Sequence, residues 1–136
     1  MASNILALPL TSLSFVVSNN EDWIDALLYA VANNPNLPTP PVGTPPVQLD
    51  LRGIDFQMEL RRSPPEHEVI LEASTAERTL YVGSPPNYGF LIWVIPVETM
   101  KYIEAGDYVG DVIADDGDFQ RRVLDLSVKI QEGITR

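Results

Sequence analysis

Cysteine is absent from this chain of 136 residues, and histidine occurs once, as His67. Without cysteine there can be no disulfide, no thiolate nucleophile and no thiolate metal site. A single histidine also excludes metal sites that are built from several histidines. These absences remove most enzyme classes, and they predict a protein without cofactor, metal or catalytic residues.

Basic side chains are scarce, because 9 Lys and Arg stand against 19 Asp and Glu, for a net charge of −10. A protein that grips nucleic acid phosphates needs a basic face, so we expect no nucleic acid partner. The longest apolar run, residues 90–97, is far shorter than the roughly 20 residues that span a bilayer. Residues 1–12 contain no basic side chain, which a secretory signal requires. We therefore expect a soluble chain without a membrane partner.

Two clusters could carry chemistry, and both have simpler interpretations. Acidic residues gather in residues 104–118, but their spacing does not match a twelve-residue calcium loop, so a hairpin turn at Asp116 and Gly117 is favoured over calcium binding. His67 lies between two glutamates after a Pro-Pro pair. No Gly-x-Ser-x-Gly elbow accompanies it, which favours an exposed loop histidine.

The twelve prolines are unevenly placed, and six of them fall within residues 35–46. Proline lacks a backbone donor and fixes φ, so residues 33–48 are predicted to form a surface loop. Too few residues precede this loop for an independent core. We therefore expect an amino-terminal arm at residues 1–12 and one domain at residues 13–136.

Apolar and polar side chains alternate strictly in residues 54–61, which is typical of a half-buried antiparallel strand. Residues 23–31 have a helix-forming composition with Asn20 or Asp22 as N-cap, and residues 97–104 predict one or two helical turns. The remaining pattern predicts an all-β sandwich of about seven to nine short strands. The other expected strands are residues 13–17, 69–73, 79–82, 90–95, 108–114, 119–124 and 126–130.

Residues 90–95 are all apolar, so both faces of this strand must be covered. Either Phe90, Ile92 and Val94 or Leu91, Trp93 and Ile95 face the core. The other set is covered either by a loop of this chain, such as the proline-rich one, or by another protein with Trp93 as anchor. Leu91, Trp93 and Ile95 are therefore candidate interface residues.

The amino-terminal segment supplies a second candidate interface through four apolar residues: Ile5, Leu6, Leu8 and Leu10. As an extended arm, this segment could add a strand to a neighbouring protein. The simpler interpretation is the first edge strand of the sandwich.

Several segments together resemble small structural proteins of tailed phages and prophages. Residues 49–61 resemble a "DLTG-x-x-F-x-M-x-x-R" segment of that family, with Arg52 in place of the threonine, and residues 71–76 resemble its "L-x-x-S-T" segment. Residues 105–136 are similar to its "G-x-Y … D-G … G-V-T-R" ending. The resemblance covers residues 49–136, and domains of this kind resemble the amino-terminal domain of the baseplate upper protein.

This resemblance implies an immunoglobulin-like β-sandwich that attaches fibres or receptor-binding proteins to the neck, tail or baseplate of a virion. Family members with a fibre shaft continue beyond the matched ending, whereas this sequence ends with it, so we expect a stand-alone adaptor or decoration subunit. Its partners would be other virion proteins and further copies of itself around a symmetric axis. A capsid decoration protein is the alternative in the same class. A carbohydrate-binding module is the alternative in another class, with Trp23, Tyr81, Tyr88 or Trp93 stacking on sugar rings.

Overall fold

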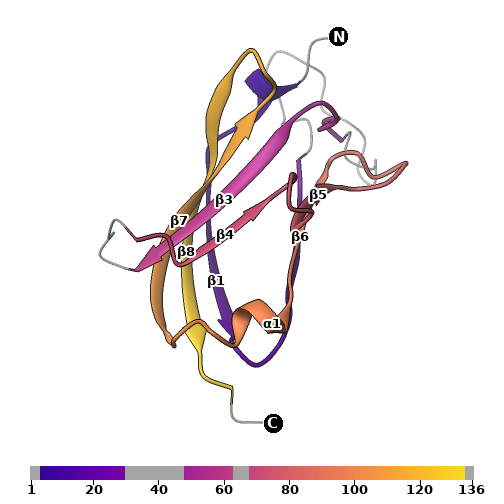
Figure 1. Cartoon of the computed structure of the whole chain (residues 1–136). Helices are drawn as coiled ribbons and strands as arrows, with labels where there is room; N and C mark the ends of the chain where they lie inside the picture. The colour runs from indigo at the N-terminus through magenta and orange to yellow at the C-terminus, as the bar shows by residue number, and fades with distance from the viewer. Residues whose placement is uncertain (1–3, 30–47, 63–67, 134–136) are drawn as a thin grey trace, which may run out of the picture.

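In a computed structural model of the chain, residues 4–29, 48–62 and 68–133 are described. They form two β-sheets that face each other across one apolar core (Figure 1). The predicted proline-rich loop, apart from Gln48, and His67 lie outside the described residues.

The larger sheet has five strands and the smaller sheet has three. In spatial order the larger sheet contains β1 (Thr11–Ser18), β8 (Gln120–Gln131), β7 (Gly106–Asp115), β3 (Asp55–Arg62) and β4 (Leu71–Ser74). The smaller sheet contains β2 (Trp23–Leu28), β6 (Phe90–Ile95) and β5 (Leu80–Val82). All neighbouring strands are antiparallel except β1 and β8, which are parallel.

This topology confirms the predicted all-β sandwich and is that of an immunoglobulin-like domain. In the strand names of the immunoglobulin fold, the smaller sheet β2, β6 and β5 corresponds to strands B, E and D. In the larger sheet, β3, β7 and β8 correspond to strands C, F and G, and β4 beside β3 corresponds to strand C′. The helix α1 (Val97–Met100) connects β6 to β7, within the segment predicted as helical turns. Near the start of β7, the Tyr108 hydroxyl donates a hydrogen bond to the Glu104 carbonyl at 2.6 Å. Such a tyrosine corner is typical of this fold.

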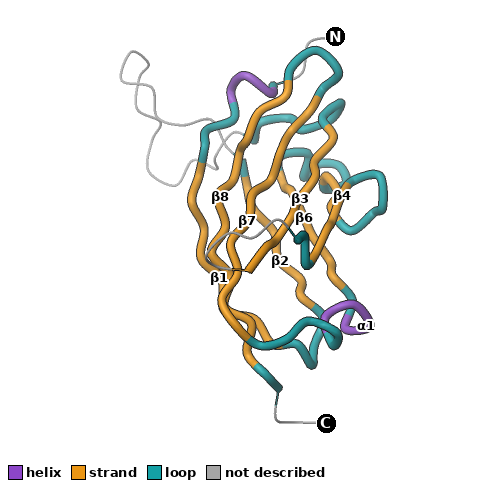
Figure 2. The backbone as a smooth tube through the Cα atoms, turned by 60° about the vertical axis from the view of Figure 1, so that its left-hand side comes forward, coloured by secondary structure: helices purple, strands orange, loops and turns teal. Residues whose placement is uncertain are grey.

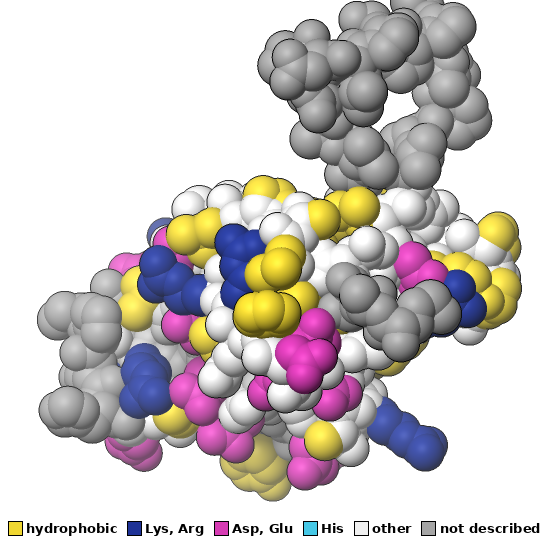
Figure 3. Space-filling model, turned by 90° about the horizontal axis from the view of Figure 1, so that it is seen from above, with side chains coloured by type: hydrophobic (Ala, Val, Ile, Leu, Met, Phe, Trp, Pro, Cys, Tyr) yellow, Lys and Arg dark blue, Asp and Glu magenta, His cyan; other side chains and the backbone are white. Residues whose placement is uncertain are grey.

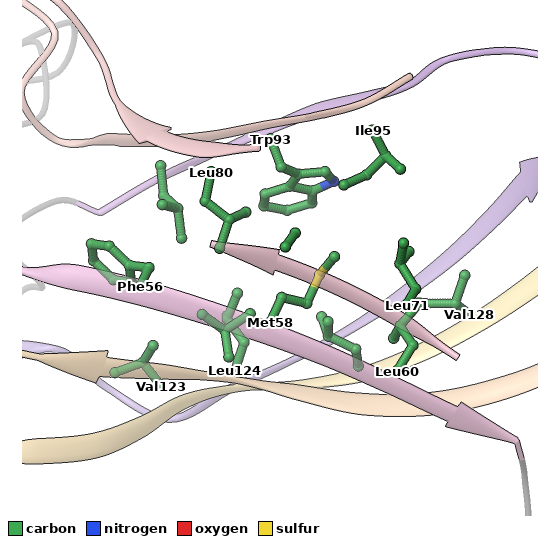
Figure 4. Close-up of a cluster of buried hydrophobic side chains, with 14 of the residues drawn as sticks. Phe56, Met58, Leu60, Leu71, Leu80, Trp93, Ile95, Val123, Leu124 and Val128 are labelled. Carbon is green, nitrogen blue, oxygen red and sulfur yellow. The ribbon is translucent and has the colours of Figure 1, made fainter. Parts of the chain in front are cut away.

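The core lies between the sheets and is built from alternate residues of each strand. Phe56, Met58 and Leu60 of β3 point towards Trp93 and Ile95 of β6 (Figure 4). Trp93 also makes edge-on contacts with Phe15 and Trp23, at centroid distances of 5.6 and 6.1 Å. Aromatic pairs in this geometry add to the stability gained from burial alone.

Two predictions of local structure are wrong. Residues 23–28 form the strand β2 and not a helix, because residues Trp23 to Leu28 pair in register with β6 and this pairing outweighs helix propensity. Residues 120–131 form one strand and not two. Val112 pairs with Leu124 and Ile113 with Arg122, so Val123 is an extra, bulged residue that interrupts the alternation.

Candidate functional site

The amino-terminal segment folds back onto its own domain. It forms a single turn, η1 (Ile5–Ala7), in which Ile5 is 1% exposed, and Leu8 after it is also 1% exposed. The Asn4 side chain donates to the Asp50 carbonyl at 2.9 Å, and Arg121 donates to the Leu6 carbonyl at 3.1 Å. Ile5 and Leu8 are therefore core residues and are not available to a partner, contrary to the predicted arm.

Two other residues of this segment are left in solvent by the same anchoring. Leu6 is 63% exposed and Leu10 is 50% exposed. Because Ile5 and Leu8 are fixed in the core, these two leucines are held outwards on an ordered backbone. Of the four interface residues predicted in this segment, two therefore belong to the core and two are exposed.

The hairpin between β7 and β8 presents a third exposed apolar side chain, Phe119, which is 52% exposed. The Phe119 backbone N–H donates to the Asp116 carboxylate at 2.8 Å, and its carbonyl accepts from the Asp116 N–H at 3.1 Å. The Asp115 carboxylate accepts from the Gly117 N–H at 2.8 Å, where φ is +94°. The acidic side chains therefore hold a hairpin turn, as predicted.

Leu6, Leu10 and Phe119 together are called the loop-end patch below. The tip of the β7–β8 hairpin lies beside η1 in both views of the backbone (Figures 1 and 2). Arg121, two residues after Phe119, bonds to the Leu6 carbonyl and links the two segments. Seen from this end, hydrophobic side chains lie directly beside basic and acidic ones (Figure 3).

The structure shows which residues of 90–95 face the core and which face outwards. Leu91, Trp93 and Ile95 are 0%, 2% and 1% exposed, so the three predicted interface residues of β6 belong to the core. Trp93 cannot anchor a partner, because the larger sheet already covers it. The outward positions are Phe90, Ile92 and Val94, which are only partly covered.

All outward positions of the smaller sheet are apolar. Ile24 pairs with Val94, Ala26 and Tyr81 flank Ile92, and Leu28 pairs with Phe90. Ile24 is 61% exposed and Tyr81 is 42% exposed. These residues are called the small-sheet face below: Ile24, Ala26, Leu28, Tyr81, Phe90, Ile92 and Val94.

The outer face of the larger sheet is charged. Glu59, Asp111 and Asp125 lie in one row across β3, β7 and β8. Burial raises the pKa of Asp111 above its ordinary value; Arg122 opposes this rise, and the carboxylates of Glu59 and Asp125 add to it. Arg61 pairs with Glu59 at 3.0 Å, and Arg122 pairs with Asp125 at 3.2 Å. These ion pairs partly balance the row.

A metal or cofactor site is not apparent in the part of the chain that the structure describes. No group of three or more acidic, histidine or cysteine side chains there could hold a metal ion. An open groove of about 870 Å³ lies between the end of β1 and the strands β7 and β8, with Asn20, Asp107 and Lys129 among its lining residues. Its lining also includes Glu21 and Glu132.

The aromatic residues considered for sugar stacking are mostly covered. Trp23 and Trp93 are each 2% exposed. The Arg52 guanidinium lies over the Tyr88 ring at 3.8 Å, and Tyr81 is 42% exposed. Phe119 and Tyr102, which is 80% exposed, were not singled out by sequence reasoning. The sequence offers one sign of exposure for each: Phe119 follows an Asp-Gly turn, and Tyr102 follows a short helix.

No model of a known protein family matches the chain, and no curated protein is significantly similar to it in sequence. Among the residues that the structure describes, no helix is long and apolar enough to cross a membrane.

Proposed function

We propose that the chain is a non-enzymatic structural protein of a tailed-phage or prophage virion, an attachment subunit at the neck, tail or baseplate. The observation that carries the docking role is the loop-end patch, where Leu6, Leu10 and Phe119 are each at least half exposed. Exposed apolar patches mark interaction sites, and a segment whose backbone is already held in place loses little entropy on binding. The virion setting is supported by the motifs in residues 49–136.

The fold adds support for docking at this end. In immunoglobulin-like sandwiches the loops cluster at the two ends, and in variable domains the binding loops share one end with the F–G hairpin. Here the β7–β8 hairpin is the F–G hairpin, and it carries Phe119. A partner that meets this end would contact Phe119 and the leucines of the amino-terminal segment together.

The test uses particles assembled with variants of the chain in place of the wild type. Leu6→Asp and Phe119→Asp place a charge in the patch, and Tyr102→Asp places one near α1 at the opposite end as a matched control. We expect the wild type and Tyr102→Asp in purified particles by mass spectrometry, and a loss of at least tenfold for both patch variants. Equal melting temperatures would show that all variants fold.

The outcomes separate the alternatives. Absence of the wild-type chain from purified particles would overturn the virion assignment, and normal incorporation of both patch variants would overturn the docking site. Antibody labelling on the capsid shell instead of the tail would favour a decoration protein. Retention of the wild type on a glycan column, lost in Tyr81→Ala, would favour a carbohydrate-binding module.

A further inference from the structure

The small-sheet face is unusual because its outward positions lack the polar residues that a solvated antiparallel sheet normally shows. Seven outward side chains on three strands are apolar, and none is charged. The outward side of the larger sheet has the ordinary character, with Glu59, Asp111 and Asp125 in one row. The two faces of the sandwich thus differ sharply in charge.

Charge favours a second copy of this chain as the occupant of the small-sheet face. Each copy carries a net charge of −10, so two copies repel each other wherever carboxylates meet. The small-sheet face is the sheet surface across which they can approach without placing carboxylate against carboxylate. An unlike partner is normally selected by complementary charges or hydrogen bonds, and this face offers neither from its strand side chains apart from the Tyr81 hydroxyl.

Geometry also favours pairing of the face with itself. A two-fold axis places the same patch on both sides of a contact, so a face of apolar side chains meets the same apolar side chains of its own copy. Sheets that pack face to face interdigitate their side chains and lie about 10 Å apart. In such a dimer four sheets would be stacked, with the two small sheets in the middle.

The size of the face sets the strength of the contact. The strands β2 and β6 have six residues each and β5 has three. At about 3.3 Å rise and about 4.8 Å spacing, the face has a footprint of about 240 Å² per copy. Stable complexes bury about 800 Å² per partner, so this contact is weak on its own. It would be populated at high local concentration, such as that of several copies placed around one axis.

We propose that the small-sheet face is a homotypic contact, through which two copies of the chain pair sheet to sheet. This contact is separate from the loop-end patch and does not depend on the virion assignment. The chain would then have two docking surfaces, one for unlike proteins at the loop end and one for its own copies.

Sedimentation equilibrium of the purified full chain tests this contact. Ile24→Glu charges the small-sheet face, and Val16→Glu is the matched control, because Val16 is 66% exposed on β1 at the outer side of the larger sheet. We expect the wild type and Val16→Glu to dimerise between about 10 µM and 1 mM, and Ile24→Glu to stay monomeric. Added salt should strengthen the dimer, because it screens the repulsion between acidic copies.

A single introduced cysteine gives a second measurement, since the chain has none of its own. Ala26→Cys should form a disulfide between copies under mild oxidation at least tenfold faster than Val16→Cys. A wild type that is monomeric at 1 mM would overturn the proposal. A dimer that forms equally in Ile24→Glu, or that salt weakens, would also overturn it.

Discussion

At the scale of single residues, Tyr29 at the end of β2 has a buried hydroxyl without a hydrogen-bond partner among the described residues. A buried donor without a partner costs about 1–3 kcal/mol, whereas a phenylalanine of the same shape would not. We expect Tyr29→Phe to raise the free energy of unfolding by about 1 kcal/mol, measured by urea denaturation. A loss of stability instead would show that the hydroxyl has a partner.

The same residue makes stability depend on pH in the alkaline range. Burial raises the pKa of Tyr29 from 10.0 to about 12. The unfolded chain therefore releases this proton at a lower pH than the folded chain, so stability is intact below pH 10 and is lost as the pH rises towards 12. The slope approaches about 1.4 kcal/mol per pH unit. Urea midpoints between pH 9 and pH 11 should fall less steeply in Tyr29→Phe, while Tyr102→Phe should behave as the wild type.

Tyr108 should respond to the same substitution with the opposite sign. Its hydroxyl donates to the Glu104 carbonyl at 2.6 Å and fixes the chain between α1 and β7. This hydrogen bond is partly buried, so its loss in Tyr108→Phe should lower the free energy of unfolding by about 1 kcal/mol, the net contribution of a typical hydrogen bond. The same urea titration measures this loss, and a neutral result would contradict a structural role of the tyrosine corner.

At the scale of elements, the amino-terminal segment should act as part of the core. Leu8 is 1% exposed and Leu6 is 63% exposed on the same short segment. Leu8→Ala creates a cavity and should cost about 2–4 kcal/mol, whereas Leu6→Ala should cost less than about 0.5 kcal/mol. Thermal or urea unfolding distinguishes them. Equal small effects would mean that the segment detaches from the domain in solution.

The sequence allowed most strands to be predicted, and its failures have identifiable causes. The strict alternation of apolar and polar residues in residues 54–61 predicted β3, because one side of that strand faces the core and the other faces solvent. The composition of residues 23–28 suits a helix as well as a strand. The pairing with β6 decides for the strand β2, and β6 lies far from β2 in the sequence, so no local pattern reveals this pairing. The break in β8 came from the bulge at Val123, which depends on the register with β7.

At the scale of the whole molecule, the candidate surfaces could be predicted only in part. The run at residues 90–95 showed that both faces of one strand are apolar. Because alternate residues of a strand face opposite sides and all six are apolar, the sequence does not indicate which set of three faces the core. The opposing sheet decides that Trp93 is inside. Similarly, apolar residues at the amino terminus indicated docking, while the contact of Arg121 with Leu6 shows which segment they meet. Phe119 and Leu6 are far apart in the chain, so no local pattern joins them.

The overall charge leads to a prediction for the complete sandwich. A net charge of −10 opposes compaction, and the row of Glu59, Asp111 and Asp125 concentrates the repulsion on the larger sheet. Exposed ion pairs such as Arg122 with Asp125 contribute only about 0.2–1 kcal/mol each, so repulsion should dominate. We therefore expect 0.5 M NaCl to raise the melting temperature at pH 7.

Asp111→Asn should reproduce part of this effect without salt. Because the pKa of Asp111 is raised in the folded state, its ionised form destabilises the fold, and stability should increase as the pH falls through that raised pKa. Like charges opposed across strands destabilise a sheet, and removing this one should stabilise the protein at pH 7 by about 0.2–1 kcal/mol, the strength of a solvent-screened charge pair, and should reduce the response to salt. Melting curves of both proteins at low and high salt measure this, with Asp118→Asn in the exposed hairpin as control. A melting temperature that falls with salt in the wild type would mean that the ion pairs outweigh the repulsion.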